Sequence, residues 1–176
     1  MKHNDPRNLI DDFKGMKEED IVKLLDKNGV SMEIAIENLE RDFNMGSIVR
    51  SANAFGVRRV HVIGRRQWNK RGAMATDRYL HILYHENVSD FVNYVHVHGM
   101  TIVCIDNVDG AKVLHESSLP SSCVLVFGSE SNGVSETLLA RADVTLAIAQ
   151  YGSTRSMNVA AAAAVAMYEW MRQHKS

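Results

Sequence analysis

Short apolar runs recur along the chain, and segments with the apolar spacing of a helix separate most of them. The runs are rich in β-branched residues and about as long as a strand. They read "MEIAIEN", "RVHVIG", "TIVCID", "CVLVFG" and "DVTLAIA". Because both faces of these strands are apolar and helices lie between them, the pattern predicts an α/β fold with a mostly parallel sheet flanked by helices.

The intervening segments predict helices that begin or end at residues typical of helix termini. The expected helices are residues 16–27, followed by Gly29; 47–55; 88–98, followed by Gly99; a segment opened by Ser135 that runs to residue 141; and an alanine-rich segment from Ser156 to about residue 173. We expect a single domain.

Composition narrows the class of protein. The 176 residues are 45% hydrophobic, enough for one core, and the formal net charge of −1 leaves any nucleic-acid binding to a local patch. Cys104 and Cys123 lie in apolar runs and predict buried thiols in a reducing compartment. The amino-terminal residues contain no apolar run of signal-peptide length, and no stretch approaches the roughly 18 apolar residues of a membrane span. We therefore expect a soluble, cytoplasmic protein.

Polar residues cluster after the predicted strands, where α/β proteins place binding sites. In the first cluster, residues 37–56, Asn44 and Gly46 open a helix on which Arg50 and Asn53 share a face. A helix-capping asparagine and a solvated arginine would explain the same pattern. In the third cluster, Ser156 and Asn158 precede an alanine run that indicates either helix propensity or close packing.

The second cluster is the glycine-rich turn "GSESNG" at residues 128–133, which follows an apolar strand. It is neither the G-x-G-x-x-G fingerprint nor a Walker loop, and Glu130 would repel a phosphate. A dinucleotide-binding oxidoreductase is therefore disfavoured. Gly128 would leave backbone groups open to a ligand that a side chain would block.

A basic stretch lies between the first two clusters. Seven lysines and arginines fall between positions 58 and 78, with Asp77 as the only acid and with Trp68 nearby. This composition is typical of a patch that binds phosphates and stacks on bases, although a solvated loop would look the same. The candidates for RNA binding are Arg65, Arg66, Lys70 and Arg71.

The histidines predict no metal centre. His81 and His85 could share a helix face, and His96 and His98 one side of a strand, but no carboxylate or cysteine ligands accompany them at metal spacing. We expect surface histidines.

Taken together, "NMGSIVRSANAFG", "LVFGSESNGVS" and "SMNVAAAAAVAMYEW" resemble the three motifs of the SpoU (TrmH-like) branch of the SPOUT RNA methyltransferases. The resemblance covers residues 31–176 and leaves residues 1–30 as a short helical extension. It implies a C-terminal trefoil knot, a homodimer, S-adenosyl-L-methionine as cofactor and a ribose 2′-hydroxyl of tRNA or rRNA as substrate. We favour tRNA, because no separate RNA-recognition domain is evident.

The resemblance also implies residue roles. Main-chain groups of Gly128, Ile148 and Met157 would contact the cofactor, with Val126 and Phe127 leading into its pocket. The reacting ribose would lie among the catalytic candidates Arg50, Asn44, Glu130, Ser156 and Asn158. The chain has Ala149, Met157 and Ala160 where the family commonly has proline, leucine and serine. These departures leave open a non-catalytic RNA-binding or cofactor-sensing module on the same fold.

Overall fold

The computed structural model describes residues 5–37, 42–64, 66, 68–129 and 131–175. Seven strands form one sheet in the order β3-β2-β1-β6-β4-β7-β5, and every pairing between them is parallel. The strands are β1 (Met32–Glu37), β2 (Arg59–Ile63), β3 (His81–His85), β4 (Thr101–Ile105), β5 (Lys112–Val113), β6 (Cys123–Phe127) and β7 (Val144–Ala147). The predicted parallel α/β sheet is confirmed.

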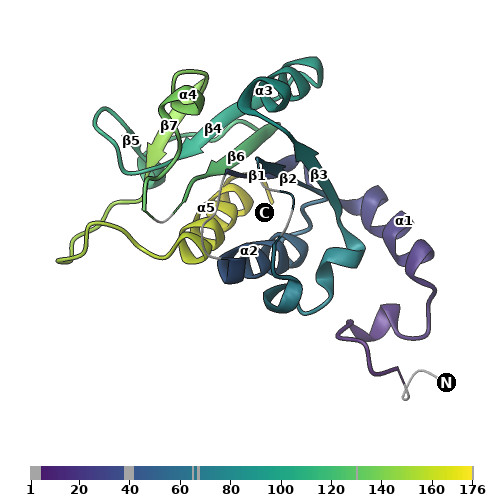
Figure 1. Cartoon of the computed structure of the whole chain (residues 1–176). Coiled ribbons are helices and arrows are strands. Elements are labelled where there is room, and N and C mark those ends of the chain that lie inside the picture. Colours follow the sequence, from purple (N-terminus) through teal and green to yellow (C-terminus); the bar gives the residue numbers. More distant parts are fainter. Residues whose placement is uncertain (1–4, 38–41, 65, 67, 130, 176) are drawn as a thin grey trace.

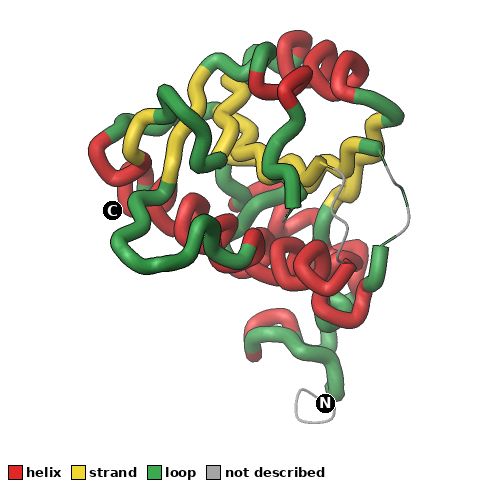
Figure 2. The backbone as a smooth tube through the Cα atoms, turned by 60° about the vertical axis from the view of Figure 1, so that its left-hand side comes forward, coloured by secondary structure: helices red, strands yellow, loops and turns green. Residues whose placement is uncertain are grey.

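Helices cover both faces of the sheet. They are α1 (Glu18–Asn28), α2 (Asp42–Ala54), α3 (Val88–Val97), α4 (Glu136–Leu139) and α5 (Val159–His174), with short 3₁₀ turns at Asp11–Phe13, Lys70–Ala73, Thr76–Tyr79 and Leu114–Glu116. Helices α2 and α5 lie side by side on one face, and α3 and α4 lie on the other (Figure 1). Figure 2 shows the strands between these two helical layers.

Strand β6 shows why the apolar runs are continuous rather than alternating. Leu125 and Phe127 pack into the core beneath α2 and α5, whereas Val124 and Val126 pack into the core beneath α3 and α4. Successive side chains of a strand point to opposite faces, so a strand covered on both sides needs apolar residues at every position.

Two strands, β3 and β5, were not predicted from the sequence. Strand β3, "HILYH", lies at the edge of the sheet and keeps polar residues at both ends, while β5 has only two residues. The predicted helix face for His81 and His85 is therefore wrong, because both lie on β3. For His96 and His98 the predicted helix over residues 88–98 is confirmed and the shared strand side is wrong, since His96 lies in α3 and His98 caps it.

Helix α5 begins later than predicted. Its N-cap is Asn158, whose Oδ1 accepts hydrogen bonds from the backbone N–H groups of Ala160 and Ala161, so Ser156 lies in the loop before the helix. Met167 and Trp170 are completely or almost completely buried in the core, whereas Tyr168 is 61% exposed. Helix α2 begins earlier than predicted, at Asp42.

Candidate active site

Three loops that follow β4, β6 and β7 converge at the carboxyl edge of the sheet and enclose a cavity of about 380 Å³. Apolar side chains from the strand ends and α5 form part of its wall, and the β6–α4 loop supplies backbone and small polar groups. The lining residues are Ile105, Asp106, Asn107, Val108, Phe127, Gly128, Ser129, Ser131, Asn132, Gly133, Ile148, Gln150, Arg155, Ser156, Met157, Val159 and Ala162.

The β6–α4 loop closes on itself at the glycine-rich turn. Ser129 and Gly133 each donate a backbone hydrogen bond to the other's carbonyl, at 3.0 and 2.9 Å, and Gly133 has a φ of 68°. A Cβ at Gly128 would lie 1.9 Å from the carbonyl carbon and oxygen of Gly133. The loop can therefore close only with glycine at position 128. This requirement is separate from the predicted access of a ligand to the backbone of Gly128.

Four of the five residues predicted for the cofactor pocket line this cavity: Phe127, Gly128, Ile148 and Met157. Val126 does not line it. Its side chain is completely buried on the opposite face of the sheet, in the core beneath α3 and α4. The one-residue alternation of β6 turns Phe127 toward the cavity and Val126 away from it.

The predicted catalytic residues are only partly brought together. Ser156 lines the cavity, and the side-chain amide of Asn158 donates to Oδ1 of Asn44 at 3.0 Å, which joins the amino-terminal parts of α5 and α2. Arg50 is exposed on α2 and is not among the described residues that line the cavity. Glu130 lies outside the described residues.

The sequence prediction missed several polar residues of the cavity wall, among them Asp106, Gln150 and Arg155. The signal for Asp106 was its place directly after the strand "TIVCI". Oε1 of Gln150 is one of two buried side-chain oxygens in the described part of the chain that accept no hydrogen bond.

The basic stretch is less charged than its composition indicates, because acidic side chains pair with it, three of them from outside the stretch. Ion pairs join Arg58 to Asp26, Arg59 to Glu33, Lys70 to Asp77 and Arg78 to Glu18 at 2.7–3.0 Å. Of the RNA-binding candidates, Lys70 also lies 5.8 Å from the centre of the Trp68 ring. Arg66 and Arg71 are exposed, and Arg65 lies outside the described residues.

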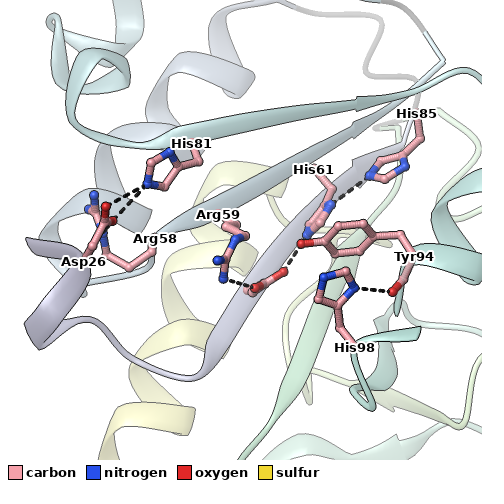
Figure 3. A network of polar contacts seen from close by, with 9 residues as sticks. Asp26, Arg58, Arg59, His61, His81, His85, Tyr94 and His98 are labelled. Carbon is pink, nitrogen blue, oxygen red and sulfur yellow. Dashed lines mark hydrogen bonds and ion pairs between the residues drawn. The ribbon is translucent and has the colours of Figure 1, made fainter. Parts of the chain in front are cut away.

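A second polar cluster lies between the sheet and α3 (Figure 3), and none of its residues lines the cavity. His61 Nε2 lies 2.7 Å from Oε2 of Glu33, and His61 Nδ1 lies 2.8 Å from Nε2 of His85. His61 is completely buried and His85 is 8% exposed, so the prediction of a surface residue is wrong for His85. Within the described residues, no group of three or more histidines, cysteines or acids could hold a metal ion.

Burial governs the ionisation of this cluster. Burial, followed by the neighbouring His61, lowers the pKa of His85 from 6.5 to about 4. Burial alone would raise the pKa of the Glu33 carboxyl, but hydrogen bonds from His61 and Arg59 outweigh it and hold that pKa below its usual value. Glu33 is therefore a carboxylate that accepts a hydrogen bond from His61 Nε2–H.

The buried thiols are confirmed, since Cys104 and Cys123 are free and inaccessible, and burial raises the pKa of each to about 12. The described part of the chain contains no helix long and apolar enough to cross a membrane.

Comparison with known proteins agrees with the motifs. The chain is 26% identical over 159 residues to tRNA (guanosine(18)-2'-O)-methyltransferase of Escherichia coli (strain K12), across 89% of this chain and 69% of that protein. The TrmH/SpoU tRNA modifying enzyme of A. aeolicus superposes with a TM-score of 0.80 at 24% identity, across 90% of this chain and 82% of that one. An AdoMet-bound rRNA methyltransferase from Sinorhizobium meliloti superposes with a TM-score of 0.76 at 23% identity, across 82% and 57%.

These superpositions cover 90% and 82% of this chain, so the predicted knotted α/β fold is confirmed. The sequence profile of the SpoU rRNA Methylase family matches residues 31–168. The chain therefore belongs to the SpoU rRNA Methylase family and is an RNA methyltransferase.

Proposed function

We propose that the protein transfers a methyl group from S-adenosyl-L-methionine to a ribose 2′-hydroxyl of tRNA. The observation that carries this proposal is the cavity formed by the loops after β4, β6 and β7, together with the Asn44–Asn158 hydrogen bond beside it. It unites parts of all three motifs at one edge of the sheet. The similarity to a guanosine-18 tRNA methyltransferase supports tRNA over rRNA.

The residues of the cavity fit this cofactor. A volume of about 380 Å³ falls within the usual range for small-molecule sites of roughly 300–1,000 Å³. Phe127 and Ile148 offer apolar surface to an adenine ring, and Gln150 offers an unpaired acceptor to an amino group. S-adenosyl-L-methionine, when bound, supplies a methyl group on a positively charged sulfur.

The residues beside the cavity would orient the RNA. Ser156 lies on the cavity wall, and the amides of Asn44 and Asn158 form a fixed pair that can bind ribose or phosphate oxygens. Arg50 follows Asn44 on α2 and would bind the phosphate next to the target ribose. Because a guanidinium keeps its proton at neutral pH, Arg50 would stabilise the developing 2′-oxyanion rather than remove the proton.

The exposed Arg66 and Arg71 would bind phosphates farther along the RNA, with Trp68 as a nearby aromatic surface. Lys70 contributes less than its charge suggests, because Asp77 already pairs with it at 3.0 Å. We further propose a homodimer, with the exposed residues of α5 forming part of its interface.

Two measurements test this function. Calorimetry should detect binding of S-adenosyl-L-methionine and none of NAD. Incubation with unmodified tRNA or rRNA, followed by nucleoside mass spectrometry, should then show a 2′-O-methylated nucleoside in tRNA. Cofactor binding without transfer to either RNA would favour a cofactor-sensing module, and transfer to rRNA alone would overturn the assignment to tRNA.

A further inference from the structure

The β6–α4 loop is anchored by carboxylates from the two strands that flank β6. Glu37, the last residue of β1, is 3% exposed. Its Oε2 accepts the backbone N–H of Ser135 at 2.8 Å, and its Oε1 accepts the hydroxyl of Ser135 at 2.7 Å. The Ser135 oxygen in turn accepts the backbone N–H of Leu138 at 3.2 Å and caps α4. One buried carboxylate thus fixes both the end of the loop and the start of the helix after it.

Asp106, directly after β4, anchors the same loop from the other side. Its Oδ2 accepts the backbone N–H of Val134 at 2.7 Å, and a Cβ on Gly133 would lie 2.3 Å from that oxygen. Strands β1 and β4 both pair with β6, so the two carboxylates stand on either side of the strand that carries the loop. Neighbouring residues Val134 and Ser135 are therefore each bound to a different strand.

This anchoring has a direct consequence for the cavity, because the loop supplies Gly128, Ser129, Ser131, Asn132 and Gly133 to its wall. A short loop rich in glycine and serine has little apolar surface to bury, so its conformation depends on its hydrogen bonds. Bonds from a backbone N–H to a carboxylate are roughly twice as strong as those between neutral groups.

We propose that Glu37 and Asp106 are positioning residues that hold the β6–α4 loop in the conformation that binds S-adenosyl-L-methionine, an inference that rests on the proposed function. Glu37 does not line the cavity and acts only through Ser135. Asp106 does line the cavity, but both of its carboxylate oxygens already accept backbone N–H groups, from Asn107 and Val134.

The first test removes the Glu37 anchor. Glu37→Ala should raise the dissociation constant of S-adenosyl-L-methionine about tenfold or more, the effect expected for a lost charge-assisted bond. The methyl-transfer rate at saturating cofactor should stay within about threefold of the wild-type rate, because the loop refolds around bound ligand. Glu37→Gln should recover most of the affinity, since its amide oxygen can accept from Ser135 N–H and its amide nitrogen can donate to the hydroxyl.

Glu33→Gln is the matched control. Glu33 lies on the same strand, faces the same side of the sheet and is 6% exposed, but its partners are His61 and Arg59. Its replacement should affect thermal stability and leave cofactor affinity unchanged. An equal loss of affinity in the Glu33 and Glu37 variants would mean general destabilisation and would overturn the positioning role.

At Asp106 the same logic separates support of the loop from contact with the ligand. Asp106→Asn keeps an oxygen for Val134 N–H and should bind the cofactor nearly as well as wild type, whereas Asp106→Ala should not. An equal loss of cofactor affinity in Asp106→Asn and Asp106→Ala would show that the negative charge of Asp106 acts on the cofactor itself. The Glu37→Ala/Asp106→Ala double variant should lose less affinity than the product of the single losses, because both changes release one loop.

Amide hydrogen exchange tests the anchor without the cofactor. In Glu37→Ala, the backbone amides of Val134 and Ser135 should exchange about tenfold faster or more, and in Glu33→Gln they should not. Unchanged exchange in Glu37→Ala overturns the inference. Wild-type protein that fails to bind S-adenosyl-L-methionine, yet shows this exchange pattern, would refute the proposed function and leave the anchoring of the loop intact.

Discussion

Asn158 caps α5 with its side-chain oxygen and binds Asn44 with its side-chain nitrogen, 3.0 Å from Oδ1 of that residue. The contact joins residues 114 positions apart. One side chain therefore both begins the C-terminal helix and connects it to α2, on which Arg50 also lies. The two roles use different atoms, so different substitutions can separate them.

Asn158→Asp should keep the cap and lose the donor to Asn44, whereas Asn158→Ala should lose both. We expect Asn158→Ala to lower the free energy of unfolding by about 1 kcal/mol, the usual cost of a lost N-cap, and Asn158→Asp to change it little. Both should reduce methyl transfer if the amide pair orients the RNA. Chemical denaturation and single-turnover transfer measure the two effects, and full activity in Asn158→Asp would limit Asn158 to capping.

Replacement of Arg50 should impair chemistry and spare cofactor binding. The residue is exposed and does not line the cavity in the described part of the chain, so Arg50→Ala should leave stability and cofactor affinity near wild type. Loss of a preorganised positive charge should slow methyl transfer about 10²–10³-fold. Arg50→Lys should be nearly as slow, because an ammonium cannot bind two oxygens in a planar fork.

Single-turnover transfer beside cofactor titration distinguishes the outcomes. Near-normal transfer by Arg50→Ala would remove the residue from the mechanism. Weakened cofactor binding would place Arg50 at the cofactor site instead of at the RNA.

The sequence predicted best those structural features that depend on residues close together in the chain. The buried central strands have apolar residues on both faces, and Ser135 and Gly99 show the capping chemistry of helix ends. These features are local, so periodicity and residue type reveal them.

The missed features depend on contacts between distant segments. From the sequence alone, His85 was expected at the surface. In the structure, β3 pairs with β2, and this pairing brings His85 2.8 Å from His61. In the sequence, Glu37 is only the last residue of a strand. Its partner Ser135, which donates a hydrogen bond to it, lies 98 positions later. In the basic stretch, the acids that neutralise Arg58 and Arg59 come from α1 and β1, so composition within the stretch overstates its charge.

The basic stretch should therefore contribute unequally to RNA binding. Arg66→Ala and Arg71→Ala should each weaken binding modestly and reduce the slope of log K against log salt by about 1. Lys70→Ala should have a smaller effect, because Asp77 already neutralises it. Filter binding at several salt concentrations measures the slopes, with cofactor affinity as the control. Unchanged RNA binding after replacement of Arg65, Arg66, Lys70 and Arg71 together would make the stretch a solvated loop.

The proposed dimer interface on α5 can use only the side chains that the subunit leaves exposed. Met167 and Trp170 are buried within the subunit and cannot contact a partner, whereas Val165 and Tyr168 are 41% and 61% exposed on α5. Tyr168→Glu should shift the protein from dimer to monomer in sedimentation, because a charge replaces apolar contact area. Val97→Glu, at an exposed site on α3 in the opposite helical layer, should leave the association state unchanged. A wild-type monomer at micromolar concentration would refute the dimer.

The buried pair His61–His85 should make folding stability depend on pH. Glu33 accepts from His61 Nε2–H, so the other ring nitrogen of His61, Nδ1, lies against Nε2 of His85 at 2.8 Å. The groups around His85 are His61 on β2 and Tyr94 and Asp90 on α3, and of these only Asp90 favours a charged His85. The effects of burial and of His61, which lower the pKa of His85, outweigh the effect of the Asp90 carboxylate, which raises it.

Because the pKa of His85 is about 4 in the folded protein and near 6.5 in the unfolded chain, only the unfolded chain binds the proton between these values. Stability should therefore fall as the pH drops from about 6.5 to 4, by at most about 1.4 kcal/mol per pH unit and at most about 3.4 kcal/mol in all. Below pH 4 the contribution of His85 is constant, and protonation of Glu33 lowers stability further.

His85→Gln tests this assignment, because glutamine can still donate an amide proton to His61 but does not titrate. Urea unfolding between pH 4.5 and 7.5 should show a flatter pH dependence for His85→Gln than for wild type. His96→Gln, which replaces an exposed histidine on α3, should keep the wild-type slope. Because none of the residues of the cluster lines the cavity, cofactor affinity at pH 7.5 should be the same in all three proteins. If His85→Gln keeps the full slope, another group causes the pH dependence.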